Sequence, residues 1–323
     1  MTVERNLELN LGLACNNRCI FCLDLTALPE ARKWLPIERA LDELHLARGE
    51  GATSVGLLGG EPTAHPRILD IVREARDAGY GRIALQTNGL RLSDPDLCRS
   101  LVESGVNRIS MSVHSFSAAD EDYLTGRAGN FAKKRRAVEN LVALRKEGFL
   151  EHNVSLNAVL TTRIHSRLVD YAGHYRQLGI TDVRFNMIRT DSCLDRGPEL
   201  TPRLQDLAPE IARAVAASES RLHMDLSFGD LPLCAYPWEI LENRPLAGRV
   251  IGEARDLDTW VAVFSAPRDL TRAPDRFKWT ERKKSALKIQ PEDPCSRCGL
   301  AELCEGVWRS YVALHGGSEL RPL

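Results

Sequence analysis

The chain has 323 residues, with 43 Lys and Arg against 44 Asp and Glu, so its formal net charge is −1. This length suits one large domain or two modest ones. The balanced charge gives no general signal for nucleic acid or for a membrane surface. The first 30 residues lack the basic start and long apolar run of a signal peptide, and no stretch reaches the roughly 18 apolar residues of a membrane span. We therefore expect a cytoplasmic protein that binds neither nucleic acid nor a membrane.

Residues 6–187 alternate short apolar runs with amphipathic helical patterns. Such repeated units favour a parallel sheet with right-handed crossovers and helices on the outside. Six units are too few for a closed eight-stranded barrel, so the α/β fold that we predict is a partial (β/α)6 barrel, with its sites at the C-terminal strand ends. The predicted strands are 7–13, 54–58, 82–86, 108–113, 153–160 and 182–187; the predicted helices are 36–48, 67–78, 96–103, 133–147 and 167–178.

The pattern changes after residue 190. A polar stretch holding Gly197 and Pro198 precedes a predicted helix at 203–218 and a predicted strand at 222–228. We interpret 191–228 as a linker that follows a barrel core at 1–190. Residues 229–323 are irregular and carry a second group of cysteines, so we expect a smaller cluster-binding extension there.

Nine cysteines are spread unevenly along the chain. In a reducing compartment they are more typical of ligands, thiols or core residues than of disulfides. Three of them, Cys15, Cys19 and Cys22, follow the first predicted strand in a polar loop. This spacing can bind three irons of a [4Fe–4S] cluster and leave the fourth iron open. Structural zinc fits less well, because no fourth Cys or His lies nearby.

The C-x3-C-x-φ-C pattern, with Phe21 as the aromatic residue, resembles the radical S-adenosylmethionine (SAM) enzymes. Further elements of that family follow successive predicted strands, so the resemblance covers about residues 6–187. They are Gly59-Gly60-Glu61-Pro62 after the second strand, Gln86-Thr87-Asn88-Gly89 after the third and Ser112-Val113-His114-Ser115 after the fourth.

The resemblance implies that a reductant such as flavodoxin or ferredoxin supplies an electron, that SAM is cleaved to a 5′-deoxyadenosyl radical, and that this radical removes a hydrogen atom from the substrate. Phe21 would lie beside adenine, Gly59 and Gly60 would let backbone approach the ligand, and Glu61 would pair with its ammonium group. The full set of implied SAM-binding residues is Phe21, Gly59, Gly60, Glu61, Pro62, Asn88, Ser112, His114 and Asn157.

The second group of cysteines, Cys295-x2-Cys298-x5-Cys304, resembles the SPASM or twitch extensions that hold auxiliary [4Fe–4S] clusters. Cys234, at G-x4-C spacing from Gly229, is the best candidate for a fourth ligand. A full SPASM domain would have a further cysteine at the position of Trp308, so we expect one auxiliary cluster. A four-cysteine zinc site is the alternative, and Cys193 could replace Cys234.

Cys193 lies in a polar loop just past the sixth predicted strand. Its thiol is a candidate hydrogen-atom donor that would complete an epimerisation; otherwise it is a loop residue or a cluster ligand. Only 14 residues precede Cys15, so we expect no N-terminal peptide-recognition domain. We therefore favour a small-molecule substrate, such as a sugar or cyclitol of secondary metabolism, for an epimerase or dehydrogenase. The alternatives are a maturase of a ribosomally made peptide and, more distantly, a zinc-stabilised binding module.

Overall fold

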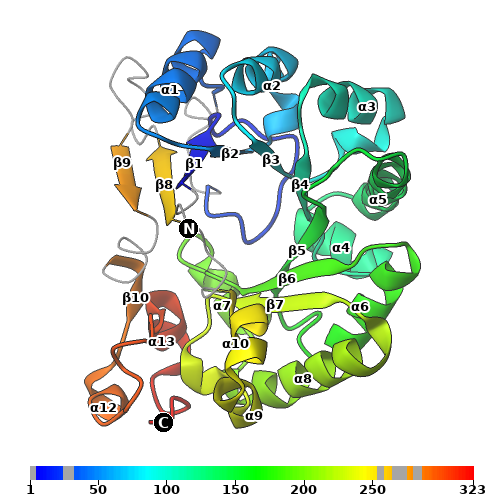
Figure 1. Cartoon of the computed structure of the whole chain (residues 1–323). Helices are drawn as coiled ribbons and strands as arrows, with labels where there is room; N and C mark the ends of the chain where they lie inside the picture. The colour runs from blue at the N-terminus through cyan, green and yellow to red at the C-terminus, as the bar shows by residue number, and fades with distance from the viewer. Residues whose placement is uncertain (1–4, 25–32, 253–257, 264–274, 279–285) are drawn as a thin grey trace.

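The computed structural model describes residues 5–24, 33–252, 258–263, 275–278 and 286–323. Its main element is a sheet in the order β7-β6-β5-β4-β3-β2-β1-β8-β9, which curves with helices around its outside (Figure 1). The prediction of a partial, open barrel is therefore confirmed. The seven strands of the barrel, all parallel, are β1 (Arg5–Asn10), β2 (Ser54–Leu58), β3 (Arg82–Thr87), β4 (Arg108–Ser112), β5 (Val154–Leu160), β6 (Asp182–Met187) and β7 (Asp225–Gly229).

Helices connect these strands, and further helices follow them in the C-terminal part of the chain. The barrel helices are α1 (Ile37–Gly49), α2 (Ile68–Asp77), α3 (Pro95–Ser104), α4 (Ala118–Thr125), α5 (Asn130–Lys146), α6 (Leu168–Gln177), α7 (Gly197–Leu200) and α8 (Leu204–Ala217). The C-terminal part contains α9 (Trp238–Glu242), α10 (Arg244–Val250), α12 (Glu292–Cys295) and α13 (Arg309–His315). No helix in the described ranges is both long enough and apolar enough to cross a membrane.

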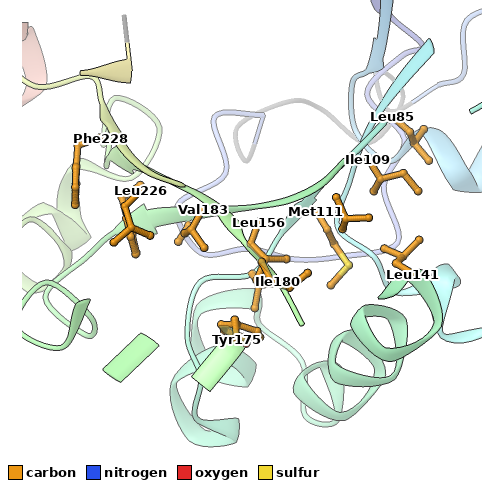
Figure 2. Packing of buried hydrophobic residues seen from close by; sticks show 14 of the residues in the cluster. Leu85, Ile109, Met111, Leu141, Leu156, Tyr175, Ile180, Val183, Leu226 and Phe228 are labelled. Carbon is orange, nitrogen blue, oxygen red and sulfur yellow. The ribbon is translucent and has the colours of Figure 1, made fainter. Parts of the chain in front are cut away.

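The main core lies between the outer face of the sheet and the helices. Alternate strand residues such as Leu85, Met111 and Val183 point to this side, where they meet Leu141 of α5 and Tyr175 of α6 (Figure 2). Because side chains alternate along a strand, the residues between them point to the opposite, concave face of the sheet. That face is polar, as described below.

The structure differs from the linker expected at residues 191–228. β7 pairs in parallel with β6, from Asp182 with Asp225 to Asn186 with Gly229, and α8 packs against α6. This segment is therefore a further βα unit of the barrel. The polar stretch that suggested a spacer instead forms short helical turns, including α7, between β6 and α8.

Strand pairing and side-chain contacts join the C-terminal part to the barrel. β8 (Asp258–Val263) lies parallel to β1, and β9 (Asp275–Lys278) lies antiparallel to β8. Farther along, the small hairpin of β10 (Lys288–Ile289) and β11 (Val307–Trp308) leads into α13. Here the Tyr311 hydroxyl accepts a hydrogen bond from the Leu204 backbone N–H at 3.0 Å, and the Arg189 guanidinium lies 5.4 Å from the Trp308 ring centre.

Candidate active site

The loop after β1 carries Cys15, Cys19 and Cys22 at the C-terminal end of that strand. All nine cysteines lie in the described part of the chain, and none forms a disulfide. The loop is held from one side by the end of α4, because the backbone N–H groups of Arg18 and Ile20 donate to carbonyl oxygens there at 3.3 and 3.0 Å. The loop is therefore fixed through its own backbone.

Two of the loop's sulfur atoms accept hydrogen bonds from amide groups. The Asn17 backbone N–H donates to Cys15 Sγ at 3.4 Å, and the Asn17 side-chain Nδ2 donates to Cys19 Sγ at 3.3 Å. Asn88 Nδ2 lies 3.7 Å from Cys15 Sγ and also donates to Asn16 Oδ1 at 2.8 Å. N–H groups directed at thiolate sulfur are a feature of iron–sulfur sites, where they help to set the reduction potential.

Gly59 and Gly60 pack directly against the cysteine loop. The Gly60 N–H donates to the Gly12 carbonyl oxygen at 2.8 Å, and the Glu61 N–H donates to the Ala14 carbonyl oxygen at 2.9 Å. A Cβ at Gly60 would lie 2.2 Å from the Ala14 oxygen. These glycines therefore allow their own segment to pack closely against the backbone of the cysteine loop. This contact fixes the position of the cysteines.

Glu61, which the resemblance implied as a partner of the ligand's ammonium group, lies between the loops after β2 and β3. The side chain is fully buried. Oε1 accepts hydrogen bonds from the Thr63 backbone N–H at 3.0 Å and the Thr87 hydroxyl at 2.6 Å, while Oε2 accepts one from the Asn88 backbone N–H at 2.6 Å. With these donors in place, Glu61 joins the loops after β2 and β3. Pro62, also buried, opens the short helix Pro62–Ala64 beside it.

Phe21 and His114 meet at the end of β4. Their rings form an edge-to-face pair with centroids 4.9 Å apart. His114 is buried, and its Nδ1 accepts a hydrogen bond from the Val159 backbone N–H at 3.3 Å. Burial lowers the pKa of His114 to about 4, against the opposing attraction of the Glu121 carboxylate. The imidazole is therefore neutral at physiological pH, and it is available as a hydrogen-bonding group rather than as a cation.

Burial raises the pKa of the Cys19 thiol to about 12, and the ammonium group of Lys134 opposes this shift. Metal ligation requires the thiolate, so binding of iron has to displace this proton. In the described part of the chain, no three His, Cys, Asp or Glu side chains are grouped as they would be around a single metal ion. Ligands of a four-iron cluster are spread more widely, because each sulfur binds a different iron.

The C-terminal cysteines converge on one pocket. Cys234, Cys295, Cys298 and Cys304 all line it, together with Pro232 and Val307 on its apolar walls. Backbone N–H groups point at these sulfurs: Leu233 donates to Cys304 at 3.4 Å, Gly306 donates to Cys304 at 3.3 Å and Leu323 donates to Cys298 at 3.5 Å. The sequence-predicted set of four is therefore brought together, and Cys193 is not among the residues that line this pocket.

Residues 9–163 match the family model described as the Radical SAM superfamily. This part of the chain is a radical SAM domain. A GTP 3′,8-cyclase of Aquifex aeolicus is 29% identical over 181 residues, which are 54% of this chain and 54% of that protein. A probable GTP 3′,8-cyclase of Thermoplasma volcanium is 34% identical over 123 residues, which are 38% of this chain and 36% of that protein. The chain thus spans between about a third and just over half of these curated relatives.

Solved structures resemble a larger part of this chain than the curated relatives do, and they share the radical SAM fold with it. SuiB of Streptococcus suis, bound to S-adenosylmethionine, superposes with a TM-score of 0.64 at 16% identity, covering 100% of this chain and 77% of that chain. SuiB has also been solved with its precursor peptide SuiA. Native anSMEcpe with bound AdoMet gives a TM-score of 0.64 at 16% identity, covering 95% of this chain and 89% of that chain. At these identities the likeness shows the fold.

Radical SAM proteins hold a [4Fe–4S] cluster and SAM, and the loop after β1 fits that cluster. Cys15, Cys19 and Cys22 would hold it, because their thiols share one loop and two of the sulfurs already receive N–H donors. When bound, the cluster and SAM together supply the 5′-deoxyadenosyl radical. Phe21 belongs to this loop, Asn88 follows β3, and Ser112 and His114 lie at the end of β4.

Cys193 lies close to the radical SAM site but is not exposed to it. Its neighbour Ser192 donates a hydrogen bond from Oγ to the Cys22 carbonyl oxygen at 2.7 Å. The Cys193 side chain is buried, and burial raises the pKa of its thiol. The group therefore stays protonated at neutral pH, which is the form that can give a hydrogen atom.

Polar residues cover the concave face of the sheet below the radical SAM site. Glu8 of β1 and Gln86 of β3 approach one another to 3.5 Å across Gly56 of β2. On the other side, Asn186 of β6 donates from Nδ2 to Asn157 Oδ1 of β5 at 2.7 Å. Arg184 of β6 donates from Nε to Asn186 Oδ1 at 3.0 Å. Asn157, expected at the SAM site, is therefore part of this polar face.

Several residues of the radical SAM site gave no signal in the sequence. Asn130 binds the Asn17 side chain at 2.9 Å. Lys134 and Glu121 form a buried ion pair under the end of β4. These residues lie far from the cysteines in sequence, and only the fold brings them together. The sequence offers one sign that Asn130 could have such a role, namely that it is a polar residue at the first position of a helix.

Proposed function

We propose that this radical SAM enzyme removes a hydrogen atom from a small polar molecule, such as a sugar or cyclitol, bound on the concave face of its barrel. The observation that carries the proposal is the polar lining of that face. Parallel barrels are ordinarily filled there by bulky branched side chains. In this chain the corresponding positions hold a carboxylate, amides and a guanidinium, all of them half-buried or exposed; they are Glu8, Gln86, Asn157, Arg184 and Asn186.

This lining suits a substrate rich in hydroxyl groups. A hydroxyl both donates and accepts, so it can bind a carboxylate, an amide or a guanidinium equally well. Half-buried polar groups that already bond to one another, as Asn157 and Asn186 do, are also held in place before a ligand arrives. A peptide side chain of apolar character would leave such groups without partners, which is costly.

The charge of the concave face favours a substrate without several phosphate groups. Glu8 contributes a negative charge and Arg184 a positive one. A nucleoside triphosphate is ordinarily bound by several cationic groups or by a metal ion. Because the relatives reported above are GTP 3′,8-cyclases, GTP is nevertheless a necessary probe in any test of this proposal.

We also propose that the four C-terminal cysteines hold one auxiliary [4Fe–4S] cluster. Their convergence on one pocket and the backbone N–H groups directed at Cys298 and Cys304 support this choice. A cluster with four protein ligands has no open iron and suits electron transfer. In a dehydrogenase it would accept the electron that remains on the substrate radical, while the substrate's proton passes to solvent.

The second form of the reaction, an epimerisation, requires a hydrogen-atom donor, and Cys193 is the candidate provided that its buried thiol becomes accessible when substrate binds. Its protonated thiol could return a hydrogen atom to the substrate radical from the face opposite to the one first attacked. The resulting thiyl radical would then need an electron and a proton, and a flavodoxin or ferredoxin is the expected source of the electron.

Replacing Cys193 with Ala distinguishes an epimerase from a dehydrogenase. An epimerase loses its product but still forms 5′-deoxyadenosine, whereas a dehydrogenase keeps both.

The first experiment tests the clusters. After anaerobic reconstitution, the wild-type protein should hold about eight irons per chain, and the Cys22→Ala and Cys298→Ala variants about four each. Cys98→Ser is the matched control, because Cys98 is buried and donates to the Leu92 carbonyl oxygen at 3.0 Å, away from both sites. About four irons and one zinc in the wild type would overturn the auxiliary cluster.

The second experiment tests the substrate class. With dithionite as reductant, deuterated myo-inositol, deuterated glucosamine, deuterated GTP and a deuterated peptide mixture are supplied separately, and the deuterium content of 5′-deoxyadenosine is measured. The proposal expects transfer from a polyol or amino sugar, in wild type and not in Cys22→Ala. Transfer from GTP alone would favour a cyclase-like reaction, and transfer from the peptides alone would favour the maturase; either result overturns the proposal.

A further inference from the structure

We propose that Asn130 is a positioning residue that turns the Asn17 side chain toward Cys19, and that the resulting N–H···S hydrogen bond makes the SAM-binding cluster easier to reduce. Asn130 is the first residue of α5, more than a hundred residues from the cysteine loop in sequence. In space, its Nδ2 lies 2.9 Å from Asn17 Oδ1, and Asn17 Nδ2 lies 3.3 Å from Cys19 Sγ. The two amides thus form a short relay that ends on a cluster ligand.

The orientation of the Asn17 amide follows from a group that can only donate. The backbone N–H of Arg18 lies 3.1 Å from Asn17 Oδ1, so that atom has to be the oxygen. The Asn130 amide donates to the same oxygen and also to the Thr125 hydroxyl at 3.0 Å. With its oxygen held by two donors, Asn17 can present only its NH₂ group to the sulfur.

Burial fixes this arrangement. Asn17 is 5% exposed and Asn130 is 3% exposed, so neither amide can exchange its partners for water. Turning the Asn17 amide over would place its oxygen against the Cys19 sulfur and its NH₂ group against two donors. Such unpaired or repelling polar groups are costly inside a protein.

The effect on the cluster is electrostatic. One-electron reduction adds negative charge to the irons and their sulfur ligands. An N–H dipole aimed at a ligand sulfur stabilises this added charge more than the charge of the oxidised cluster, so the reduction potential rises. Because Asn17 carries the donor and Asn130 only orients it, a change at Asn130 should act through Asn17.

The test measures the midpoint potential of the SAM-binding cluster in the full-length, reconstituted protein. Titanium(III) citrate is the reductant, and the cluster's electron paramagnetic resonance signal is recognised by its change when SAM is added. Asn17→Ala removes the donor, and Asn130→Ala removes the orienting group. Asn130→Asp puts an acceptor against Asn17 Oδ1, which favours the turned-over amide. The matched control is Asn140→Ala on the same helix, since Asn140 donates to the Leu92 carbonyl oxygen at 2.9 Å, away from the cysteine loop.

We expect a potential that becomes more negative in Asn17→Ala and in Asn130→Asp, a smaller shift of the same sign in Asn130→Ala and none in Asn140→Ala. Asn130→Ala should cause no further shift when it is added to Asn17→Ala. An unchanged potential in Asn17→Ala, or a second full shift in the double variant, overturns the proposal. If Asn17→Ala fails to hold iron, the Asn130 variants decide: unchanged potentials in both of them overturn it.

Discussion

Lys134 Nζ lies 2.6 Å from Glu121 Oε1, and neither side chain is more than 1% exposed. Each partner also forms hydrogen bonds with the backbone at the end of β4. Lys134 donates to the Ser112 carbonyl oxygen at 2.8 Å, and Glu121 Oε2 accepts the backbone N–H groups of His114 and Ser115, both at 2.7 Å. The ion pair therefore joins α4 and α5 to the strand end that carries His114. It is a structural support for the radical SAM site.

Breaking this pair should destabilise the protein strongly. Lys134→Met leaves the Glu121 carboxylate buried without its cation, which costs about 3–5 kcal/mol of unfolding free energy. The double variant Lys134→Met/Glu121→Gln should recover much of that loss, because no buried charge then remains. Urea denaturation measures both effects, with exposed Lys133→Met as the control. A double variant no more stable than the single one would contradict this account.

Gly60→Ala should prevent the cluster from binding. The added Cβ would lie 2.2 Å from the Ala14 carbonyl oxygen, so the cysteine loop would have to move away from the loop after β2. Iron analysis after reconstitution should show loss of the SAM-binding cluster. Gly173→Ala on α6 is the control, since its Cβ would meet nothing within 4 Å, and it should keep wild-type iron content.

His114 should make the protein less stable in mild acid. Its pKa is about 4 in the folded state, because of burial, against an ordinary value of about 6.5. Between these pH values the unfolded chain takes up a proton that the folded protein does not. Stability therefore falls as the pH drops from 6.5 to 4, by up to about 3 kcal/mol, and this group causes no further loss below pH 4.

Replacing His114 with Gln should flatten that pH dependence. The comparison is the slope of unfolding free energy against pH, from pH 7.5 to 5, for wild type, His114→Gln and the exposed-site control His152→Gln. Equal slopes in wild type and His114→Gln would show that another group causes the acid sensitivity.

Gly229→Ala should reduce the space available to a substrate on the concave face without disturbing the clusters. The new Cβ would lie 2.5 Å from Asn186 Oδ1 and 3.0 Å from a terminal guanidinium nitrogen of Arg184. We expect normal iron content and normal SAM cleavage without substrate, but a several-fold loss of deuterium transfer from the substrate. Gly248→Ala on α10 is the matched control, with open space around its Cβ.

The sequence predicted most of the barrel and the two groups of cysteines, because both depend on local patterns. Apolar runs and their spacing revealed the first six strands, and cysteine spacing indicated which cysteines are candidate ligands. β7 was missed as a barrel strand because the polar residues before it suggested a linker. β8 and its place beside β1 could not be predicted, since strand order depends on contacts between distant segments.

The roles of single residues were harder to predict than their positions. Glu61 carries a charge, which suggested a ligand contact, but the sequence did not indicate its donors Thr87 and Asn88, which lie on another loop. Asn130 and Lys134 belong to an ordinary-looking charged helix. Their importance depends on which face of α5 is turned toward the cysteine loop, and the weak amphipathic pattern of that helix did not indicate this.

The pairing of β1 with β8 also has a consequence for the chain during its synthesis on the ribosome. Arg5 aligns with Asp258, so one edge of β1 has no partner until about 250 further residues have left the ribosome. At common rates of synthesis this interval lasts roughly 12–50 s. An open strand edge is a template for pairing with other chains. A product truncated before β8 would keep that edge permanently, so incomplete translation should yield aggregates rather than a soluble fragment.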